Sequence, residues 1–288
     1  MKLTNKFNLP DPIVNAVNNT GYTPGSSDIT VTQIIQPPLI RYLTKKHWND
    51  LEEDVSARVW ALFGTAIHHL LEMAYKGRTA RVEERVYAEV LGWKIGGAFD
   101  VLEGSSLSDY KVTSVYSVGG KIEWEQQLNI YAWLVEKVKK TPVKSLEIIA
   151  IIRDWSRRDA QVKEGYPEAP IKVIDVPLWS FEDRENFIKE RVRLHSNASF
   201  ALETGSDLPE CSPSEMWEKQ TVWAVRKTGN VRAKAVCNTE EDAKAKLEEL
   251  GKGYEIEVRQ GERTRCANFC QVRDFCQQWR DYQDANNS

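Results

Sequence analysis

The chain has 288 residues, of which 41% are hydrophobic and 28% charged, and its formal net charge is −3. This composition excludes a disordered chain and is typical of a folded globular protein. No apolar run reaches the roughly 20 residues of a membrane-spanning helix. Proteins that coat DNA through charge alone carry a basic excess, so DNA contacts here require a local basic surface. The N-terminal segment lacks the apolar run of a signal peptide, which favours a cytoplasmic location in a bacterium or a phage-infected host.

The N-terminal quarter is expected to combine an arm with helical segments. Residues 1–28 are rich in Asn, Pro, Gly and Ser and predict an extended arm. Residues 29–44 begin as a strand or helix that a Pro-Pro pair interrupts. The apolar residues of 54–75 fall at helical spacing, with Gly64 as the point of a kink or break.

The middle of the chain alternates between strand and helix periods. Such an order predicts an α/β domain with a mixed sheet flanked by helices, and we assign it to residues 29–210. In chain order the expected elements are strands at 86–91, 93–102 and 107–113, a helix at 121–139, a strand at 146–153, a surface loop at 157–170, a strand at 171–178 and a helix at 181–203.

Residues 211–288 are expected to form a separate small region that contains every cysteine of the chain. An inserted β-β-α-β unit is predicted, because two strand-like runs flank a Thr-Gly-Asn turn and a capped helix and another strand follow. Its elements are expected at 222–226, 232–236, 239–250 and 254–259.

Two aspartates and a lysine carry the clearest chemistry of the sequence. Asp109 and Lys111 lie two residues apart in one predicted strand and therefore share a face, and a hairpin brings Asp100 beside them. Carboxylates suit Mg²⁺ and Mn²⁺, which activate water and stabilise charge on a phosphodiester. A lysine can position that water or bind phosphate oxygens. Taken alone, the pattern is also that of a solvated cross-strand charge pair.

The flanking motifs favour the functional interpretation. Together with these flanking motifs, the segment that carries Asp100, Asp109 and Lys111 resembles the RecB-like branch of the PD-(D/E)xK nucleases. This branch includes nuclease domains of bacterial recombination helicase-nucleases, CRISPR-associated RecB-type exonucleases and many phage exonucleases. The resemblance covers about residues 30–140 by motif and extends to the C-terminus through the cysteines. The motifs, in the family's order, are Gly64-Thr65-x-x-His68, Gly97-x-x-Asp100, Asp109-x-Lys111 and Gln127-x-x-x-Tyr131.

The resemblance implies a restriction-endonuclease-like core and a role for each matching residue. His68, Asp100 and Asp109 would be ligands of Mg²⁺ or Mn²⁺. The backbone carbonyl of Tyr110 would be a further ligand, and Lys111 would be the catalytic lysine.

The helical motifs are less specific when they are taken singly. Gln127 and Tyr131 lie one helical turn apart and would contact DNA phosphate or orient the site. A lone histidine on an apolar helix is more often a core residue, and the family's spacing selects His68 over its neighbour His69. Glu72, one turn after His68, either hydrogen-bonds that histidine or is a surface residue.

The cysteines predict a metal centre, because disulfides are rare in cytosolic proteins. Cys266, Cys270 and Cys276 are closely spaced, and the fourth ligand is Cys211 or Cys237. We favour Cys211, since it follows the core in a turn-like segment. Four thiolates fit zinc or a [4Fe–4S] cluster, and the resemblance favours iron–sulfur. Family members often place the distant cysteine before the core, which this chain does not.

The sequence therefore predicts a metal-dependent DNA exonuclease that acts on DNA with a free end, in bacterial or phage recombination or repair. The alternatives are a DNA-end-binding module of a larger helicase-nuclease complex and a zinc-stapled protein unrelated to nucleic acids. A helicase or recombination partner and an oligomer are both compatible with the sequence, and no membrane is expected. The basic and aromatic residues that could contact DNA are Arg153, Arg157, Arg158, Lys163, Arg191, Arg193, Trp155 and Trp179.

Overall fold

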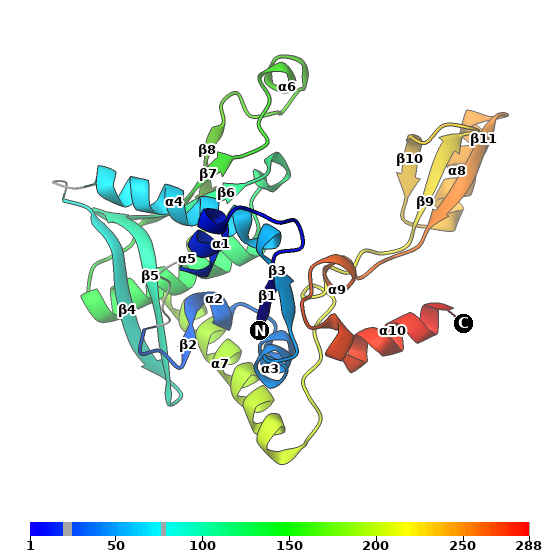
Figure 1. Cartoon of the computed structure of the whole chain (residues 1–288). Coiled ribbons are helices and arrows are strands. Elements are labelled where there is room, and N and C mark those ends of the chain that lie inside the picture. The colour runs from blue at the N-terminus through cyan, green and yellow to red at the C-terminus, as the bar shows by residue number, and fades with distance from the viewer. Residues whose placement is uncertain (20–24, 76–78, 288) are drawn as a thin grey trace.

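A computed structural model of the chain describes residues 1–19, 25–75 and 79–287, and its centre is a mixed sheet flanked by helices (Figure 1). The strands follow the order β2-β5-β6-β7-β8, and β4 pairs with β5. In the described part of this sheet, the β6–β7 and β2–β5 pairs are parallel and the other pairs are antiparallel. The strands of this sheet are β2 (Ile29–Thr30), β4 (Arg81–Val90), β5 (Trp93–Glu103), β6 (Ser106–Thr113), β7 (Ser145–Ile152) and β8 (Ile171–Val176).

Helices cover both faces of this sheet. The Tyr110 hydroxyl lies 3.3 Å from that of Tyr75, at the end of α4, whereas the neighbouring Lys111 reaches α5. Because successive side chains of a strand point to opposite faces, α4 and α5 lie on opposite sides of β6. None of the helices in the described part of the chain combines the length and apolar character that a membrane crossing requires. The helices of the core are α2 (Val31–Ile34), α3 (Pro38–Lys46), α4 (Val59–Ala74), α5 (Ile122–Leu134), which continues as a π-helical turn (Val135–Lys139), and α7 (Phe181–Thr204).

Two expectations for the core were wrong. The arm over 1–28, of which 20–24 lie outside the described residues, contains β1 (Lys2–Thr4), which pairs with β3 (Glu52–Asp54), and α1 (Asp11–Asn18). The loop over 157–170 contains α6 (Arg157–Val162), because the Ser156 hydroxyl caps its first turn. Of the two alternatives at Gly64, the structure has the single helix, since α4 runs through this residue.

The C-terminal region contains the predicted β-β-α-β unit. Its sheet has the order β10-β9-β11, and the Thr239 hydroxyl accepts a hydrogen bond from the Asp242 amide at the start of its helix. Figure 1 shows this unit projecting from the core. The elements of the region are β9 (Val222–Lys227), β10 (Ala233–Cys237), α8 (Glu240–Leu250), β11 (Tyr254–Arg259), α9 (Thr264–Asn268), a 3₁₀ turn (Arg273–Phe275) and α10 (Gln277–Asn287).

The segment after the inserted unit packs on the core rather than standing alone. Leu39 and Leu43 of α3 share an apolar cluster with Val272 and Cys276 of the C-terminal tail. A boundary at 210/211 therefore passes through a shared hydrophobic core, and the tail and α3 should gain their order together.

Candidate active site

The predicted site residues meet where β5 and β6 separate. The two strands pair only from Val101 opposite Ser108 to the turn, and beyond this point they diverge. The Asp100 side chain spans the opening, since its Oδ2 accepts a hydrogen bond of 2.7 Å from the Tyr110 amide. The fork therefore leaves backbone groups of β6 available to side chains instead of to a neighbouring strand.

Lys111 lies at the mouth of this fork. Its Nζ is 2.6 Å from Asp109 Oδ2 and donates to Gln127 Oε1 on α5 over 3.1 Å. The carboxyl of Asp109 is almost fully buried, whereas the lysine is only partly covered. The ammonium group is thus held by one carboxylate and one amide, with one side toward solvent.

His68 approaches the fork from α4. Its Nε2 lies 3.0 Å from the carbonyl oxygen of Tyr110, and its Nδ1 lies 3.4 Å from Glu83 Oε1 and 3.5 Å from Asp100 Oδ2. One ligand atom each from His68, Glu83 and Asp100 lies within 4.8 Å of the others. The structure therefore adds Glu83 to the residues that the sequence motifs identify.

Burial and charge make these groups strongly interdependent. Burial, with the Asp109 carboxylate as the second cause, raises the pKa of Asp100 to about 7. The hydrogen bond to Glu83 raises the pKa of His68 to about 9, against the opposing effect of its burial. Two buried carboxylates this close disfavour each other's charged form, and a divalent cation beside them would relieve this repulsion.

The donor set fits Mg²⁺ or Mn²⁺. Oxygen and nitrogen ligands about 2.1 Å from an octahedral ion lie roughly 3.0 Å apart when adjacent, and His68 Nδ1 lies 3.4 Å from Glu83 and 3.5 Å from Asp100. An imidazole among carboxylates suits Mn²⁺ well. The three residues whose ligand atoms lie close enough to hold such an ion together are thus His68, Glu83 and Asp100. The Tyr110 carbonyl faces the other nitrogen of His68, and Asp109 contacts Lys111.

The second half of the glutamine–tyrosine motif lies against β5. The ring of Tyr131 is buried beside Gly97, where an added Cβ would lie 2.9 Å from its Cε1 and Oη atoms. The absence of a side chain at Gly97 therefore lets α5 approach the strand that carries Asp100. Gln127, one turn earlier, is thereby placed next to Lys111.

Several other candidates have structural roles instead. Glu72 contacts the exposed ring of His69 at 3.7 Å, so it does not orient His68. The indole groups of Trp155 and Trp179 donate to Pro167 and Glu125. The Arg191 side chain forms an ion pair with Glu215 and donates to backbone carbonyls.

Four cysteines line one cavity between α3 and the C-terminal tail, namely Cys211, Cys266, Cys270 and Cys276. Cys237 ends β10 in the inserted unit, opposite Trp223. Burial raises the pKa of the Cys211 thiol to about 12 and that of Cys266 to about 11, and the neighbouring thiols add to both shifts. These thiols would ionise together only beside a compensating cation.

The spacing of the sulfur atoms differs from that of a closed zinc site. A tetrahedral zinc with 2.3 Å bonds to sulfur holds its ligands roughly 3.8 Å apart. Within the described residues, no three cysteine sulfurs lie within 4.8 Å of one another. The four thiols are therefore not gathered as the ligands of a closed zinc site are.

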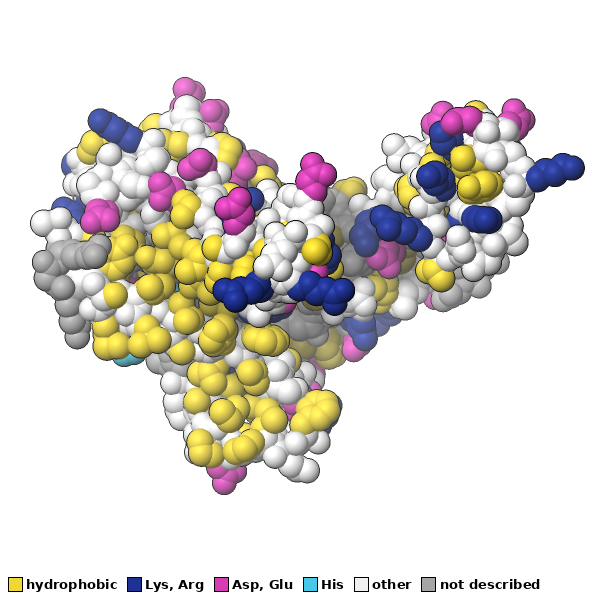
Figure 2. All heavy atoms as spheres, turned by 90° about the horizontal axis from the view of Figure 1, so that it is seen from above, with side chains coloured by type: hydrophobic (Ala, Val, Ile, Leu, Met, Phe, Trp, Pro, Cys, Tyr) yellow, Lys and Arg dark blue, Asp and Glu magenta, His cyan; other side chains and the backbone are white. Residues whose placement is uncertain are grey.

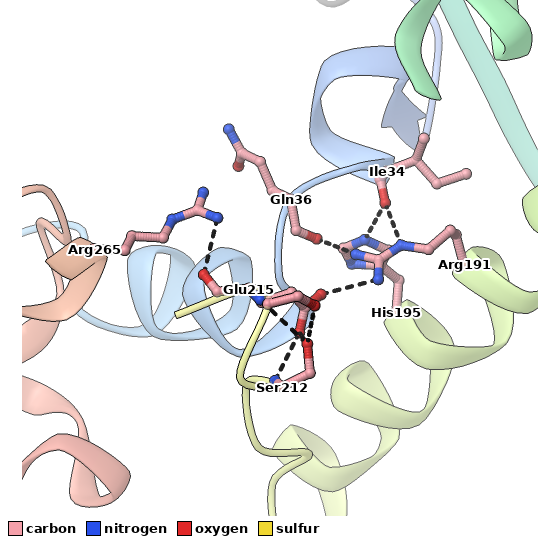
Figure 3. Close-up of polar contacts among 8 residues, drawn as sticks. Ile34, Gln36, Arg191, His195, Ser212, Glu215 and Arg265 are labelled. Carbon is pink, nitrogen blue, oxygen red and sulfur yellow. Dashed lines mark hydrogen bonds and ion pairs between the residues drawn. The ribbon is translucent and has the colours of Figure 1, made fainter. Parts of the chain in front are cut away.

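A polar seam attaches the Cys211 segment to the core (Figure 3). Arg191 of α7 donates to the carbonyls of Ile34 and Gln36 and forms an ion pair of 3.0 Å with Glu215. The buried His195 ring lies 3.1 Å from the same Ile34 carbonyl. The seam thus connects α2, α7 and the segment that follows Cys211.

Comparison with solved structures finds distant likenesses. No family model matches the chain, and no curated protein matches it in sequence. The protein SSO0001 is similar in structure, with 18% identity, 63% of this chain and 84% of that chain covered, and a TM-score of 0.45. A candidate exonuclease from Eubacterium rectale is similar at 14% identity, with 61% and 68% covered and a TM-score of 0.29. The activity must therefore be argued from the site itself.

Proposed function

We propose that this chain is a metal-dependent DNA nuclease, and specifically an exonuclease of the RecB-like PD-(D/E)xK type that processes DNA ends in bacterial or phage recombination. The observation that carries the proposal is the convergence of Asp100, Asp109 and Lys111 in the fork between β5 and β6. Two buried carboxylates would repel a DNA phosphate unless a cation lay between them. The proximity of these two carboxylates to a lysine therefore favours catalysis over DNA binding alone.

The residues have distinct roles in this proposal. His68, Asp100, Asp109 and the Tyr110 carbonyl would hold Mg²⁺ or Mn²⁺, which supplies Lewis acidity and a more acidic bound water. Lys111, oriented by Asp109 and Gln127, donates a hydrogen bond to the attacking water or to a phosphate oxygen.

The remaining helical residues act through position. Tyr131 packs against Gly97 and so sets the height of α5 above β5. Gln127 on the same helix accepts from the Lys111 ammonium, which keeps that group directed toward the carboxylates. In the reaction, the water oxygen bonds to phosphorus and gives up one proton, the bond from phosphorus to the leaving deoxyribose oxygen breaks, and that oxygen takes up one proton.

The test compares cleavage of end-labelled linear DNA and covalently closed circular DNA with Mg²⁺, Mn²⁺ or EDTA. We expect metal-dependent cleavage of the linear DNA alone. The cleavage rate should fall at least about 100-fold in Lys111→Ala, since general acid–base catalysis and charge stabilisation each contribute on this scale. Lys144→Ala, an exposed lysine far from the fork, is the matched control. Equal cleavage by Lys111→Ala and the wild type would contradict the proposal.

We propose separately that Cys211, Cys266, Cys270 and Cys276 bind a [4Fe–4S] cluster, which ties the C-terminal tail to α3. Their common cavity, and the absence among the described residues of three cysteine sulfurs within 4.8 Å of one another, support this choice over zinc. Metal analysis of protein purified without oxygen should find about four iron atoms per chain. Cys211→Ala should lower the iron content, whereas Cys237→Ala should not. Stoichiometric zinc, or iron loss only in Cys237→Ala, would overturn this assignment.

A further inference from the structure

A stretch without acidic residues runs through the unit that is inserted between Cys211 and Cys266. It lies between Glu218 and Glu240 and forms β9, the loop after it and β10. In a chain with a net charge of −3, this uneven distribution creates a local positive field. The basic residues of the stretch are Lys219, Arg226, Lys227, Arg232 and Lys234.

Hydrogen bonds order the end of the unit that this stretch reaches. The Asn230 amide donates to the Lys227 carbonyl over 2.9 Å and closes a turn. The Arg226 guanidinium donates to the Asn230 carbonyl over 2.8 Å. The Thr228 amide donates over 2.9 Å to the carbonyl of Gly253, which lies in the loop before β11. The loop between β9 and β10 and the loop before β11 therefore form one preorganised surface.

This surface carries exposed cations. Arg226 is engaged by Glu255 and Glu257, but within the described residues no acidic partner faces the other basic side chains at this end. Val231, at the point of the loop, is 90% exposed, so the described part of the chain leaves this end uncovered. We call the exposed, unpaired cations of the two loops the basic tip, and they are Lys227, Arg232, Lys234 and Lys252.

The basic tip lies at the end of the unit that points away from the core. The six residues of β9 carry the chain roughly 20 Å from the start of that strand, at about 3.3 Å per residue. Figure 1 shows β9 leading away from α9 and the core, and Figure 2 shows Lys and Arg side chains on the projecting unit. A ligand of the tip is therefore one that extends beyond the core.

We propose that the basic tip binds the sugar–phosphate backbone of a DNA duplex and so holds the double-stranded arm of the substrate outside the candidate active site. The inference rests on the proposed nuclease function and adds that the substrate includes a duplex. Exposed lysines and arginines bind phosphates without reading the sequence of bases, and they release the counterions that the phosphates had held.

The chemistry of the tip favours a duplex over a single strand. Sites for single strands combine cations with aromatic rings that stack on unpaired bases, and residues 227–234 and 251–253 contain no aromatic residue. A duplex presents one negative charge per roughly 1.7 Å of its axis. It is also stiff over about 150 base pairs, so it can contact the core and the projecting tip together.

A second copy of this chain is the competing occupant of the tip. The first turn of α8 is acidic, with Glu240, Glu241 and Asp242, and it could face the tip of another molecule. However, Glu240 already pairs with Lys244 of its own helix over 2.7 Å. Charge complementarity therefore favours the duplex, whose phosphates form a continuous row.

The test measures the anisotropy of a labelled duplex of about 30 base pairs, roughly 100 Å long, in EDTA so that no cleavage is needed. We compare Lys227→Gln with Lys234→Gln in one chain (the tip variant) and the wild type. The tip variant should bind at least about 10-fold more weakly at 0.1 M salt. Its slope of log affinity against log salt should be smaller by about 1.8, since each neutralised phosphate contributes about 0.9.

The matched control removes two lysines from the same unit. Lys244→Gln with Lys246→Gln in one chain (the helix variant) should bind the duplex almost as the wild type does, because these lysines already pair with Glu240 and Glu249. A single strand of the same length should lose less affinity than the duplex in the tip variant, since it has no stacking partner at the tip.

Four results would overturn the inference. These are duplex binding by the tip variant equal to that of the wild type, equal losses in the tip and helix variants, a loss confined to the single strand, and a dimer in sedimentation that only the tip variant lacks while its duplex binding stays intact. The last would identify the tip as an interface between copies of this chain. Cleavage with Mg²⁺ is scored separately, so a chain that binds duplex through the tip without cutting DNA would contradict only the nuclease proposal.

Discussion

Glu83 has a backbone conformation that glutamate rarely adopts. Its φ of +49° lies in the left-handed region, which costs a residue with a side chain about 1–2 kcal/mol. The neighbouring pairs, Val82 with Val101 and Glu84 with Phe99, place it opposite Asp100. The unusual conformation accompanies a carboxylate that reaches the His68 ring, so we interpret it as strain retained for the site.

Replacing Glu83 tests whether it belongs to the metal site. Glu83→Gln keeps the size of the side chain but removes its charge, and we expect Mn²⁺ affinity to fall at least about 10-fold, the lower range for residues that support metal ligands. Titration calorimetry would measure this without any substrate. Glu84→Gln is the control, because Glu84 pairs with Lys139. Equal Mn²⁺ affinity in Glu83→Gln and the wild type would show that metal binding is not the reason for the strained backbone of Glu83.

Sequence motifs locate most of the fork but not Glu83. His68, Asp100 and Lys111 stand in recognisable motifs, whereas Glu83 lies in a charged run with no motif of its own. Its place depends on the hairpin register, which the two-residue turn at Leu91 and Gly92 sets, both with positive φ. Counting back across that turn from Asp100 would have identified Glu83 as the opposite residue.

At the level of elements, the site depends on how closely α5 approaches β5. Gly97 is the residue at the contact, because Tyr131 occupies the space that any Cβ would fill. The strands and the long helices were predicted from their periods, but β4 begins at Arg81, five residues before the expected strand at 86–91. The elements that were not predicted are β1, β3, α1, α6, α9 and α10. Of these, β1 and β3 are short strands that stabilise each other, and the Ser156 side chain caps α6.

Gly97→Ala should separate α5 from β5. We expect the free energy of unfolding to fall by about 1–3 kcal/mol, the usual cost of overpacking a buried contact, and the Lys111–Gln127 contact to loosen. Urea unfolding measures the first effect. Gly119→Ala, where an added Cβ meets nothing within 4 Å, should change stability far less. Two variants of equal stability would show that α5 can shift without cost.

At the scale of the whole molecule, several contacts join the core to the cysteine-bearing tail, and two of them differ in their chemistry. One is the apolar cluster of α3 with Val272 and Cys276, and the other is the polar seam of Arg191, His195 and Glu215. The apolar cluster is insensitive to pH, whereas the seam contains a buried ring that must stay neutral. Burial lowers the pKa of His195 to about 4.

Acid should therefore weaken the molecule at this seam. The unfolded chain takes up a proton on His195 near pH 6.5, but the folded chain does so only near pH 4. The contribution of His195 to stability is thus complete above pH 6.5 and declines as the pH falls to 4, by up to about 1.4 kcal/mol per pH unit.

His195→Gln removes this titration and retains a donor for the Ile34 carbonyl. Urea unfolding at pH 7.5 and pH 5 should therefore show a smaller loss of stability in acid for His195→Gln than for the wild type. His69→Gln, at an exposed histidine, should keep the wild-type difference. If His195→Gln lost as much stability in acid as the wild type, the buried ring would already be protonated or hydrated in the folded chain, and the acid sensitivity would arise at other groups.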